Sequence, residues 1–150
     1  MGKAGVRRTG KAIVRPYAVR GLLIEEEKIL FIRHACRNPA MFDKWTFPGG
    51  RLDPEETDAL TALHREIQEE LSIDIEVVGE VGVFYSRSGL DYTIFAARPL
   101  GMIGPLQLDE IREVTWLTPA EVYEWHTREK LQFGFEMQAV SAYLKQFPWP

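Results

Sequence analysis

The sequence has little of what would place it among disulfide-bonded, zinc-binding or membrane proteins. Its single cysteine, Cys36, cannot form an internal disulfide, and no cysteine and histidine positions have the spacing of a zinc site. No apolar run reaches the roughly 18 residues that a membrane-crossing helix needs, and no apolar segment follows the basic N-terminus as in a secretory signal. We therefore expect a soluble, cytoplasmic protein without a membrane anchor.

Acidic residues are also missing from the first fifteen positions, which carry five basic ones: Lys3, Arg7, Arg8, Lys11 and Arg15. The whole chain has a net charge of -4 and a pI near 5.4, so it has no general attraction to nucleic acid. We interpret residues 1–11 as a flexible basic arm. One alternative function is therefore a nucleic-acid-binding domain that uses this arm.

Size and composition fit one globular domain, which we place at residues 12–150. Of the 150 residues, 45% are hydrophobic and 27% are charged, enough for one core but not for two. Apolar periodicity predicts strands at residues 17–24, 29–35, 45–47, 73–86, 92–98 and 113–118, and helices at 58–71, 118–126 and 133–147. Pro48, Gly49 and Gly50 are expected to end the third strand. This order predicts an α/β (α+β) sandwich, a mixed β-sheet flanked by helices.

The helix predicted for residues 58–71 has two different sides. Its apolar residues recur at steps of three and four and should face the core: Leu60, Leu63, Ile67 and Leu71. Three glutamates share another sector, about 100° wide at 100° per residue: Glu66, Glu69 and Glu70. Like charges at these spacings repel, so a positive partner is expected. Clustered carboxylates suit Mg²⁺ or Mn²⁺, and a solvated acidic face is the alternative.

A glycine pair stands just before this helix, in the segment WTFPGG at residues 45–50. Glycine lets the backbone approach a ligand closely and offer it a carbonyl or an amide group. A simple turn would explain Gly49 and Gly50 if they stood alone. The combination with REIQEE at residues 65–70 favours one site built from both segments.

At these residues the sequence resembles the Nudix hydrolase family, whose signature box is G-x5-E-x7-R-E-U-x-E-E-x-G-U, with U a bulky aliphatic residue. Gly50 and Glu56 have the first spacing. The second half of the box is matched by Arg65, Glu66, Ile67, Glu69, Glu70 and Ile73. The resemblance covers residues 12–146 and implies a Nudix-type α/β/α sandwich.

Two positions depart from the box. Eight residues rather than seven separate Glu56 from Arg65, so the role of the first glutamate could fall to Glu55 or Glu56, or be partly lost at Thr57. Ser72 replaces the second glycine, and a left-handed serine costs roughly 1 kcal/mol relative to glycine. These departures support a second alternative, a catalytically weakened Nudix-fold module for nucleotide binding or regulation.

The resemblance implies hydrolysis of the pyrophosphate bond in a nucleoside diphosphate linked to another group, with Mg²⁺ or Mn²⁺ as cofactor. Implied catalytic residues are Glu66, Glu69 and Arg65, the last orienting a glutamate through a charge-assisted bond. The implied metal ligands are the Gly49 carbonyl, Glu66, Glu69, Glu70 and Glu110. For the general base, Glu66 or Glu69 competes with the later acids Asp109, Glu110 and Glu113.

Aromatic and basic residues outside the box are candidates for substrate binding. Arg33, Arg51 and Arg87 could hold phosphate, whereas Phe42, Tyr85 and Tyr92 could stack on a base. Of these we select Arg33, Arg51 and Tyr85. The expected partner is a nucleotide-type small molecule, most simply a nucleoside triphosphate, oxidised or not, that is cleaved to pyrophosphate and a nucleoside monophosphate. Similar proteins often form homodimers, which we expect as an option here.

Overall fold

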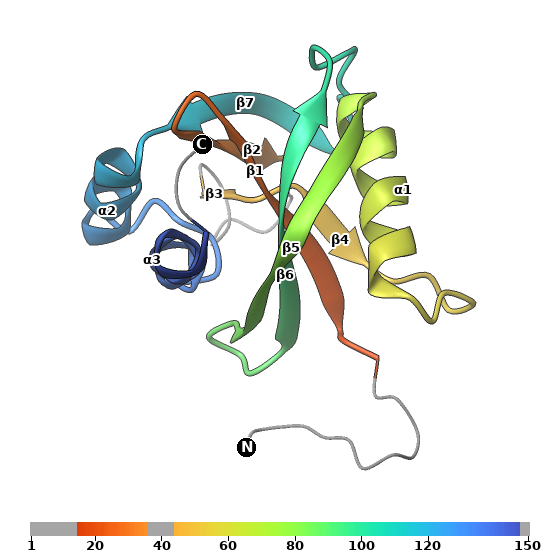
Figure 1. Cartoon of the computed structure of the whole chain (residues 1–150), viewed down its shortest axis with the longest axis horizontal. Helices are drawn as coiled ribbons and strands as arrows, with labels where there is room; N and C mark the ends of the chain where they lie inside the picture. The colour runs from red at the N-terminus through yellow and green to blue at the C-terminus, as the bar shows by residue number, and fades with distance from the viewer. Residues whose placement is uncertain (1–14, 36–43, 148–150) are drawn as a thin grey trace.

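The computed structural model describes residues 15–35 and 44–147, which form a central β-sheet with helices on both faces (Figure 1). The strands are β1 (Ala18–Glu25), β2 (Lys28–His34), β3 (Trp45–Thr46), β4 (Gly49–Arg51), β5 (Asp74–Tyr85), β6 (Asp91–Leu100) and β7 (Ile111–Leu117). The helices are α1 (Ala59–Leu71), α2 (Pro119–Thr127) and α3 (Glu136–Gln146). Helix α1 covers one face, whereas α2 and α3 lie on the other.

The sheet is mixed, as the sequence predicts. Its strands follow the order β3-β2-β1-β6-β5, with β4 paired to β1 and β7 paired to β2. The pairing of β1 with β6 is parallel, and the other pairings of named strands are antiparallel. The predicted α/β (α+β) sandwich is therefore confirmed, and β1 lies near its centre.

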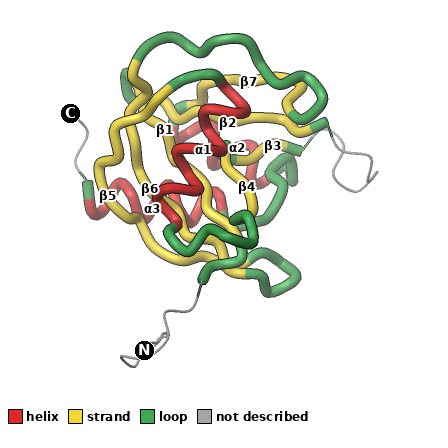
Figure 2. The backbone as a smooth tube through the Cα atoms, turned by 90° about the vertical axis from the view of Figure 1, so that its right-hand side faces the viewer, coloured by secondary structure: helices red, strands yellow, loops and turns green. Residues whose placement is uncertain are grey.

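Two hydrophobic cores sit on opposite faces of the sheet, because side chains alternate along β1. Leu22 and Ile24 point to the core beneath α2 and α3. Val19 and Leu23 point to the core beneath α1. Figure 2 shows the same layering from the side, with α1 in front of the strands.

Helix α1 begins after Asp58, whose Oδ1 accepts a hydrogen bond from the Leu60 N–H at 3.1 Å. The predicted core stripe is correct for its last three members, since Leu63, Ile67 and Leu71 are fully buried. It is wrong for Leu60, which is 37% exposed. Leu60 lies in the first turn, whereas α1 packs against the sheet through residues farther along.

The third strand ends at Thr46, before Pro48 and the glycine pair as predicted, but the glycine pair begins a further strand that the sequence did not indicate. Residues Gly49–Arg51 form β4, which runs antiparallel to β1 with Gly49 opposite Arg20. Gly49 has φ of 143°, and a Cβ atom there would lie 2.6 Å from the Arg20 Cα. Glycine is required here because β4 passes so close to β1.

Helix α2 begins with a capping box, in which the side chains of Thr118 and Glu121 each accept a hydrogen bond from the other residue's backbone N–H. Helix α3 begins at Glu136, three residues later than predicted. The delay has a local cause: the buried Glu136 carboxylate accepts hydrogen bonds from the Phe133 and Gly134 N–H groups. These bonds hold residues 133–135 in a turn ahead of the helix.

Some sequence-based expectations lie outside the described residues, namely those for the basic arm at residues 1–11, for Cys36 and for Phe42. Within the described ranges, the helices are too short and too polar to cross a bilayer.

Candidate active site

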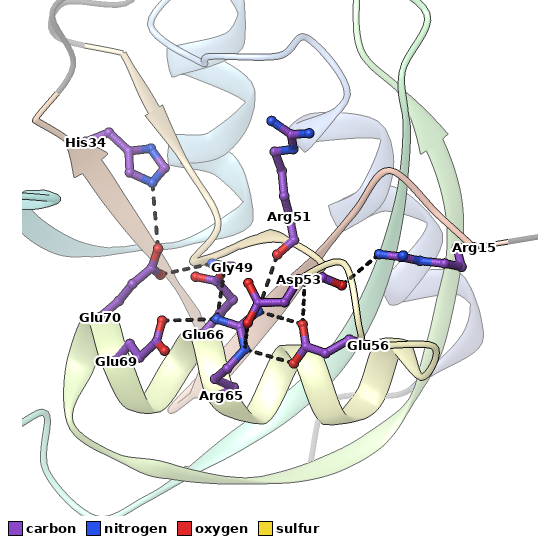
Figure 3. A network of polar contacts seen from close by, with 10 residues as sticks. All are labelled: Arg15, His34, Gly49, Arg51, Asp53, Glu56, Arg65, Glu66, Glu69 and Glu70. Atoms are coloured by element: carbon purple, nitrogen blue, oxygen red, sulfur yellow. Dashed lines mark hydrogen bonds and ion pairs between the residues drawn. The ribbon is translucent and has the colours of Figure 1, made fainter.

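The acidic side of α1 lies against residues Gly49 and Gly50, which we call the glycine corner (Figure 3). The Gly49 N–H donates a hydrogen bond to Oε1 of Glu70 at 3.0 Å. A Cβ atom on Gly50 would lie 2.6 Å from the Glu66 carboxyl carbon. Because neither glycine has a side chain, the carboxylates of Glu66 and Glu70 can approach the backbone closely here. The structure therefore brings together the segments at residues 45–50 and 65–70, as the sequence predicts.

Arg65 occupies the edge of this acidic cluster and binds several of its members. Its Nη1 lies 3.1 Å from Glu69 Oε1 and 3.4 Å from Glu66 Oε2. Its Nε and Nη2 each donate to one carboxylate oxygen of Glu56 at 2.8 Å. These negative partners raise the pKa of Arg65, so the guanidinium stays charged and fixes the carboxylates around it.

One carboxylate of the loop before α1 makes a bidentate contact with Arg65. It is that of Glu56, whose Oε1 also accepts a hydrogen bond from the Asp53 N–H at 2.7 Å. The bond from Arg65 lowers the pKa of Glu56 to about 2. Glu55 and Thr57 are exposed, so the extra loop residue is accommodated without loss of this contact.

The surroundings of Glu66 disfavour the charged form of its carboxyl group. Burial, followed by the negative charges of Glu70 and Glu69, raises its pKa to about 7. The Glu66 side chain is only 14% exposed, whereas that of Glu69 is 53% exposed. Carboxylates that repel one another in this way are suited to a shared cation.

Glu70 is the buried member of the cluster, at 3% exposure. Its Oε2 lies 3.8 Å from Nε2 of His34, a residue of β2 that sequence reasoning missed. The other ring nitrogen of His34 lies 3.5 Å from Oε1 of Gln132. No local sequence pattern indicates that His34 lies near the cluster, because residues 34, 70 and 132 are far apart in the sequence and come together only in the fold.

The later acids are placed differently from one another. Glu110 lies in an exposed turn before β7, where burial and the charges of Glu70, Asp109 and Glu69 raise its pKa. Its carboxylate is therefore within electrostatic range of Glu69 and Glu70, and its role as an additional metal ligand stays a prediction. Glu113 lies on β7 and pairs with Arg33 instead.

The donor set of the cluster fits a hard divalent cation, since it consists of carboxylate oxygens beside a glycine backbone. Within residues 15–35 and 44–147, however, no three acidic, histidine or cysteine side chains are already arranged as ligands of one ion. Arg65 draws Glu66 and Glu69 toward itself, and Glu70 is bound by Gly49. Glu66, Glu69 and Glu70 are the residues that could hold the ion.

Ser72, the second departure from the signature box, takes the left-handed conformation that glycine favours, with φ of 56° and ψ of 40°. Its hydroxyl donates to the Pro105 carbonyl at 2.8 Å. Gly104 lies directly opposite, where a Cβ atom would be 2.7 Å from the Ser72 Cβ. The helix therefore ends in the same conformation that a glycine at position 72 would adopt. The Ser72 side chain fits because the residue opposite it, Gly104, has none.

The three residues selected for substrate binding have separate surroundings. Arg33 pairs with Glu113 and lies over the Trp45 ring at 5.7 Å. Arg51 lies over the Tyr17 ring at 5.0 Å. Tyr85, at the end of β5, is 61% exposed. The contacts of these side chains do not bring them to one point.

The other two described candidates are Tyr92, on the face of the sheet that α3 covers, and Arg87, in the turn between β5 and β6. Arg87 donates a hydrogen bond from Nη1 to the Gln132 carbonyl at 2.8 Å. Tyr92 is buried in the core beneath α3, with its ring 4.8 Å from that of Phe133. Tyr92 is therefore part of an aromatic group rather than an exposed stacking platform.

Comparison with known proteins gives a family and a fold. A family model described as a NUDIX domain matches residues 14–135. A NUDIX hydrolase from Nitrosomonas europaea has a TM-score of 0.74 at 20% identity, with 91% of this chain and 93% of that chain covered. A MutT protein from Methanosarcina mazei Go1 has a TM-score of 0.67 at 19% identity, with 91% and 99% covered.

A third solved structure has a longer chain. It is a bifunctional NMN adenylyltransferase/ADP ribose pyrophosphatase from Francisella tularensis, complexed with AMP and a Mn ion. Its TM-score is 0.66 at 21% identity, with 90% of this chain and 43% of that chain covered. Among curated proteins, none matches the sequence.

Proposed function

The chain belongs to the Nudix hydrolase family, and on that premise we propose that it is a metal-dependent pyrophosphohydrolase of nucleoside triphosphates, oxidised or not. The products would be pyrophosphate and a nucleoside monophosphate. The observation that carries the proposal is the meeting of Glu66 and Glu70 with the glycine corner at residues 49–50, with Glu69 held beside them by Arg65.

The acidic cluster supports a metal requirement through its charge. A polyphosphate and three carboxylates repel each other, so cations must lie between them. Bound Mg²⁺ or Mn²⁺ would neutralise charge on the leaving oxygen and activate water. In this proposal Glu66, Glu69, Glu70 and the Gly49 carbonyl hold the ion, with Glu110 as an additional ligand. The Francisella tularensis relative, complexed with AMP and a Mn ion, is consistent with this ligand class.

Arg65 has a positioning role in the proposed reaction. Its two bonds to Glu56 anchor the guanidinium independently of the cluster. Nη1 therefore remains available to orient Glu66 and Glu69 as they engage the ion. We assign proton abstraction from water to Glu66, which is the less exposed of the two box glutamates considered as base.

Two features argue against the alternative of a catalytically weakened binding module. The extra loop residue leaves the contact between Glu56 and Arg65 intact. Ser72 ends α1 in the conformation that a glycine would adopt. The other parts of the proposal, a domain at residues 12–150, a cytoplasmic location and a homodimer, are predictions from the sequence and the resemblance.

The decisive experiment is hydrolysis of a nucleotide panel with Mg²⁺ or Mn²⁺, followed by release of pyrophosphate. Glu69→Gln and Glu66→Gln should each lower kcat by about 100-fold or more, because each removes a ligand or the base. Glu80→Gln, an exposed carboxylate on β5, is the matched control and should retain full activity. Wild-type protein that binds nucleotides but releases no product from any member of the panel would establish the binding module instead.

A further inference from the structure

His34 is the last residue of β2, and its ring faces the acidic cluster on α1 (Figure 3). Nε2 of the ring lies 3.8 Å from Oε2 of Glu70, and Nδ1 lies 3.5 Å from Oε1 of Gln132. The side chain of His34 is 19% exposed, whereas that of Glu70 is only 3% exposed. No step of the proposed hydrolysis uses this histidine, although it lies against the buried member of the cluster.

Gln132 sets which nitrogen of the His34 ring carries a proton. The backbone of Gln132 is held on both sides, since its N–H donates to the Trp45 carbonyl at 2.8 Å and its carbonyl accepts from Arg87 Nη1 at 2.8 Å. Its side-chain oxygen faces Nδ1 of His34, and a carbonyl oxygen can only accept a hydrogen bond. In the neutral ring the proton is therefore on Nδ1, and the lone pair of Nε2 points to Glu70.

Glu70 presents one carboxylate oxygen to this lone pair. Its Oε1 is engaged by the Gly49 N–H, and among the described residues its Oε2 accepts no hydrogen bond. The 3.8 Å between Oε2 and Nε2 is too long for a hydrogen bond. Two ligand atoms that are each about 2.1 Å from one ion lie roughly 3 to 4 Å apart, a range that includes this distance. A cation between the two atoms would therefore stabilise their arrangement.

The contact with Gln132 is of the kind that supports a metal-binding histidine. Such a histidine usually donates its second ring N–H to an oxygen acceptor, which orients the ring toward the ion. The alternative is an ion pair, in which a protonated Nε2 faces the Glu70 carboxylate. The two arrangements predict opposite results when the ring is removed, because a ligand strengthens cation binding and an imidazolium opposes it.

Glu110 lies beside the same end of β2. In the pairing of β2 with β7, His34 is opposite Ile111, and the Ala35 N–H donates to the Glu110 carbonyl at 2.8 Å. His34 is also among the groups that influence the pKa of Glu110, where it opposes the rise caused mainly by burial. Glu110 and water are therefore candidates for the coordination positions that His34 and Glu70 leave open.

We propose that Nε2 of His34 and Oε2 of Glu70 bind the same divalent cation, and that this nitrogen ligand makes the site prefer transition-metal ions such as Mn²⁺ and Co²⁺ to Mg²⁺. This inference rests on the proposed function, because Glu70 is one of the residues that hold its ion. Imidazole is a ligand for transition metals, whereas Mg²⁺ is bound through oxygen atoms and keeps several waters. The ion reaches the pair from the side on which His34 and Glu66 are partly exposed.

Pulsed electron paramagnetic resonance of the protein with Mn²⁺ alone tests the ligand directly, because a coordinated imidazole nitrogen modulates the echo of the ion. Wild type should show this nitrogen modulation, and His34→Gln should not. His64 is an exposed histidine on α1, so His64→Gln is the matched control and should behave as wild type. Mn²⁺ that is bound by wild type without nitrogen modulation would overturn the proposal.

Calorimetry with Co²⁺ and with Mg²⁺ tests the preference, at about pH 8, where an ordinary imidazole is neutral. His34→Gln should bind Co²⁺ at least about 10-fold more weakly than wild type and Mg²⁺ less than about 3-fold more weakly. Gln132→Met keeps the ring but removes its acceptor, and should weaken Co²⁺ binding about 10-fold. Unchanged or tighter Co²⁺ binding by His34→Gln would show the ion pair instead, and equal losses for both ions would refute the preference. If His34→Gln fails to fold by circular dichroism, Gln132→Met and the wild-type resonance spectrum decide.

The same preparations separate this inference from the proposed function. Protein that shows the nitrogen modulation but hydrolyses no nucleotide would keep His34 as a ligand and refute the hydrolase. Protein that hydrolyses nucleotides with Mn²⁺ but shows no nitrogen modulation would do the reverse. Protein that binds neither Mn²⁺ nor Co²⁺ would overturn the inference whatever its activity.

Discussion

At the scale of single side chains, Arg65 shows how the acidic cluster is stable before any ligand binds. The guanidinium contacts three glutamates, and its strongest contact is with Glu56, outside the helix. That bond lowers the pKa of Glu56 to about 2, compared with an ordinary value near 4.5. The Glu56 carboxylate is therefore charged in the folded protein at pH values where it would be protonated in the unfolded chain.

This shift predicts how stability depends on pH. Because the folded pKa lies below the unfolded one, the stabilisation is complete above about pH 4.5 and is lost as the pH falls toward 2. Glu56→Gln should lower the free energy of unfolding by about 1 kcal/mol at pH 7, and the difference from wild type should shrink to zero at low pH. Chemical denaturation between pH 7 and pH 2.5 measures both quantities.

The neighbouring carboxylate supplies a control for this measurement. Glu55 is exposed, and Glu55→Gln should follow the wild-type curve at every pH. A constant gap between wild type and Glu56→Gln down to pH 2.5 would mean that titration of Glu56 is not the cause.

Single residues also mark the limit of prediction from the sequence. Helical spacing was enough to bring Glu66, Glu69, Glu70 and Arg65 together, since they lie within six consecutive positions. Spacing could not decide between Glu55 and Glu56, because a loop does not fix which carboxylate reaches the arginine. His34 was out of reach, as it meets Glu70 and Gln132 only in the folded chain.

At the scale of elements, the end of α1 depends on a pair of residues far apart in the sequence. Ser72 has a positive φ, and its Cβ occupies the space that a side chain at position 104 would need. The Gly104 N–H also donates to the Leu71 carbonyl at 2.9 Å. The loop before β7, which carries Glu110, is thus attached to the C-terminus of the acidic helix.

This pairing predicts a coupled effect of two substitutions. Gly104→Ala should destabilise the protein by about 1 to 3 kcal/mol, because its Cβ atom would lie 2.7 Å from the Ser72 Cβ. Ser72→Gly in the same chain should recover part of that loss by removing the obstructing atom. Thermal unfolding of both single variants and the double variant gives the coupling energy. Strictly additive effects would show that the two positions do not interact.

The elements themselves were largely predictable where periodicity is strong. The mixed sheet, the capping box of α2 and the core stripe of α1 beyond Leu60 all follow from apolar spacing and cap residues. Strand β4 was missed because glycines at residues 49–50 end most strands, whereas here they allow close pairing with β1. The late start of α3 was missed because it depends on a buried carboxylate, Glu136.

At the scale of the whole molecule, the sheet separates two cores and places the candidate functional groups on different faces. The clustered carboxylates lie on α1, on one side of the sheet, whereas Tyr92 and Phe133 belong to the core on the α3 side. The glycine corner at residues 49–50 is in contact with Arg20 of β1 and with Glu66 of α1. We therefore expect ion binding at the acidic cluster to change the free energy of unfolding of the whole domain.

A divalent cation should raise the global stability of the protein. At ten times its dissociation constant, Mg²⁺ or Mn²⁺ stabilises the folded state by about 1.4 kcal/mol, which corresponds to about 4 °C in Tm for a chain of this size. Glu69→Gln should lose most of this shift, whereas Glu80→Gln should retain it. Differential scanning fluorimetry across a metal titration measures the effect. An unchanged wild-type Tm at saturating concentrations of both ions would contradict a metal site in the folded protein.

The contacts of Arg65 have a consequence for biogenesis. The Arg65 guanidinium already offsets part of the negative charge of Glu66 and Glu69, which a metal ion would otherwise have to offset alone. If the proposed ion binds here, newly made chains would therefore not need it to fold. Arg65 would keep Glu56 as its partner when Glu66 and Glu69 turn to the ion, because both bonds to Glu56 lie outside the cluster.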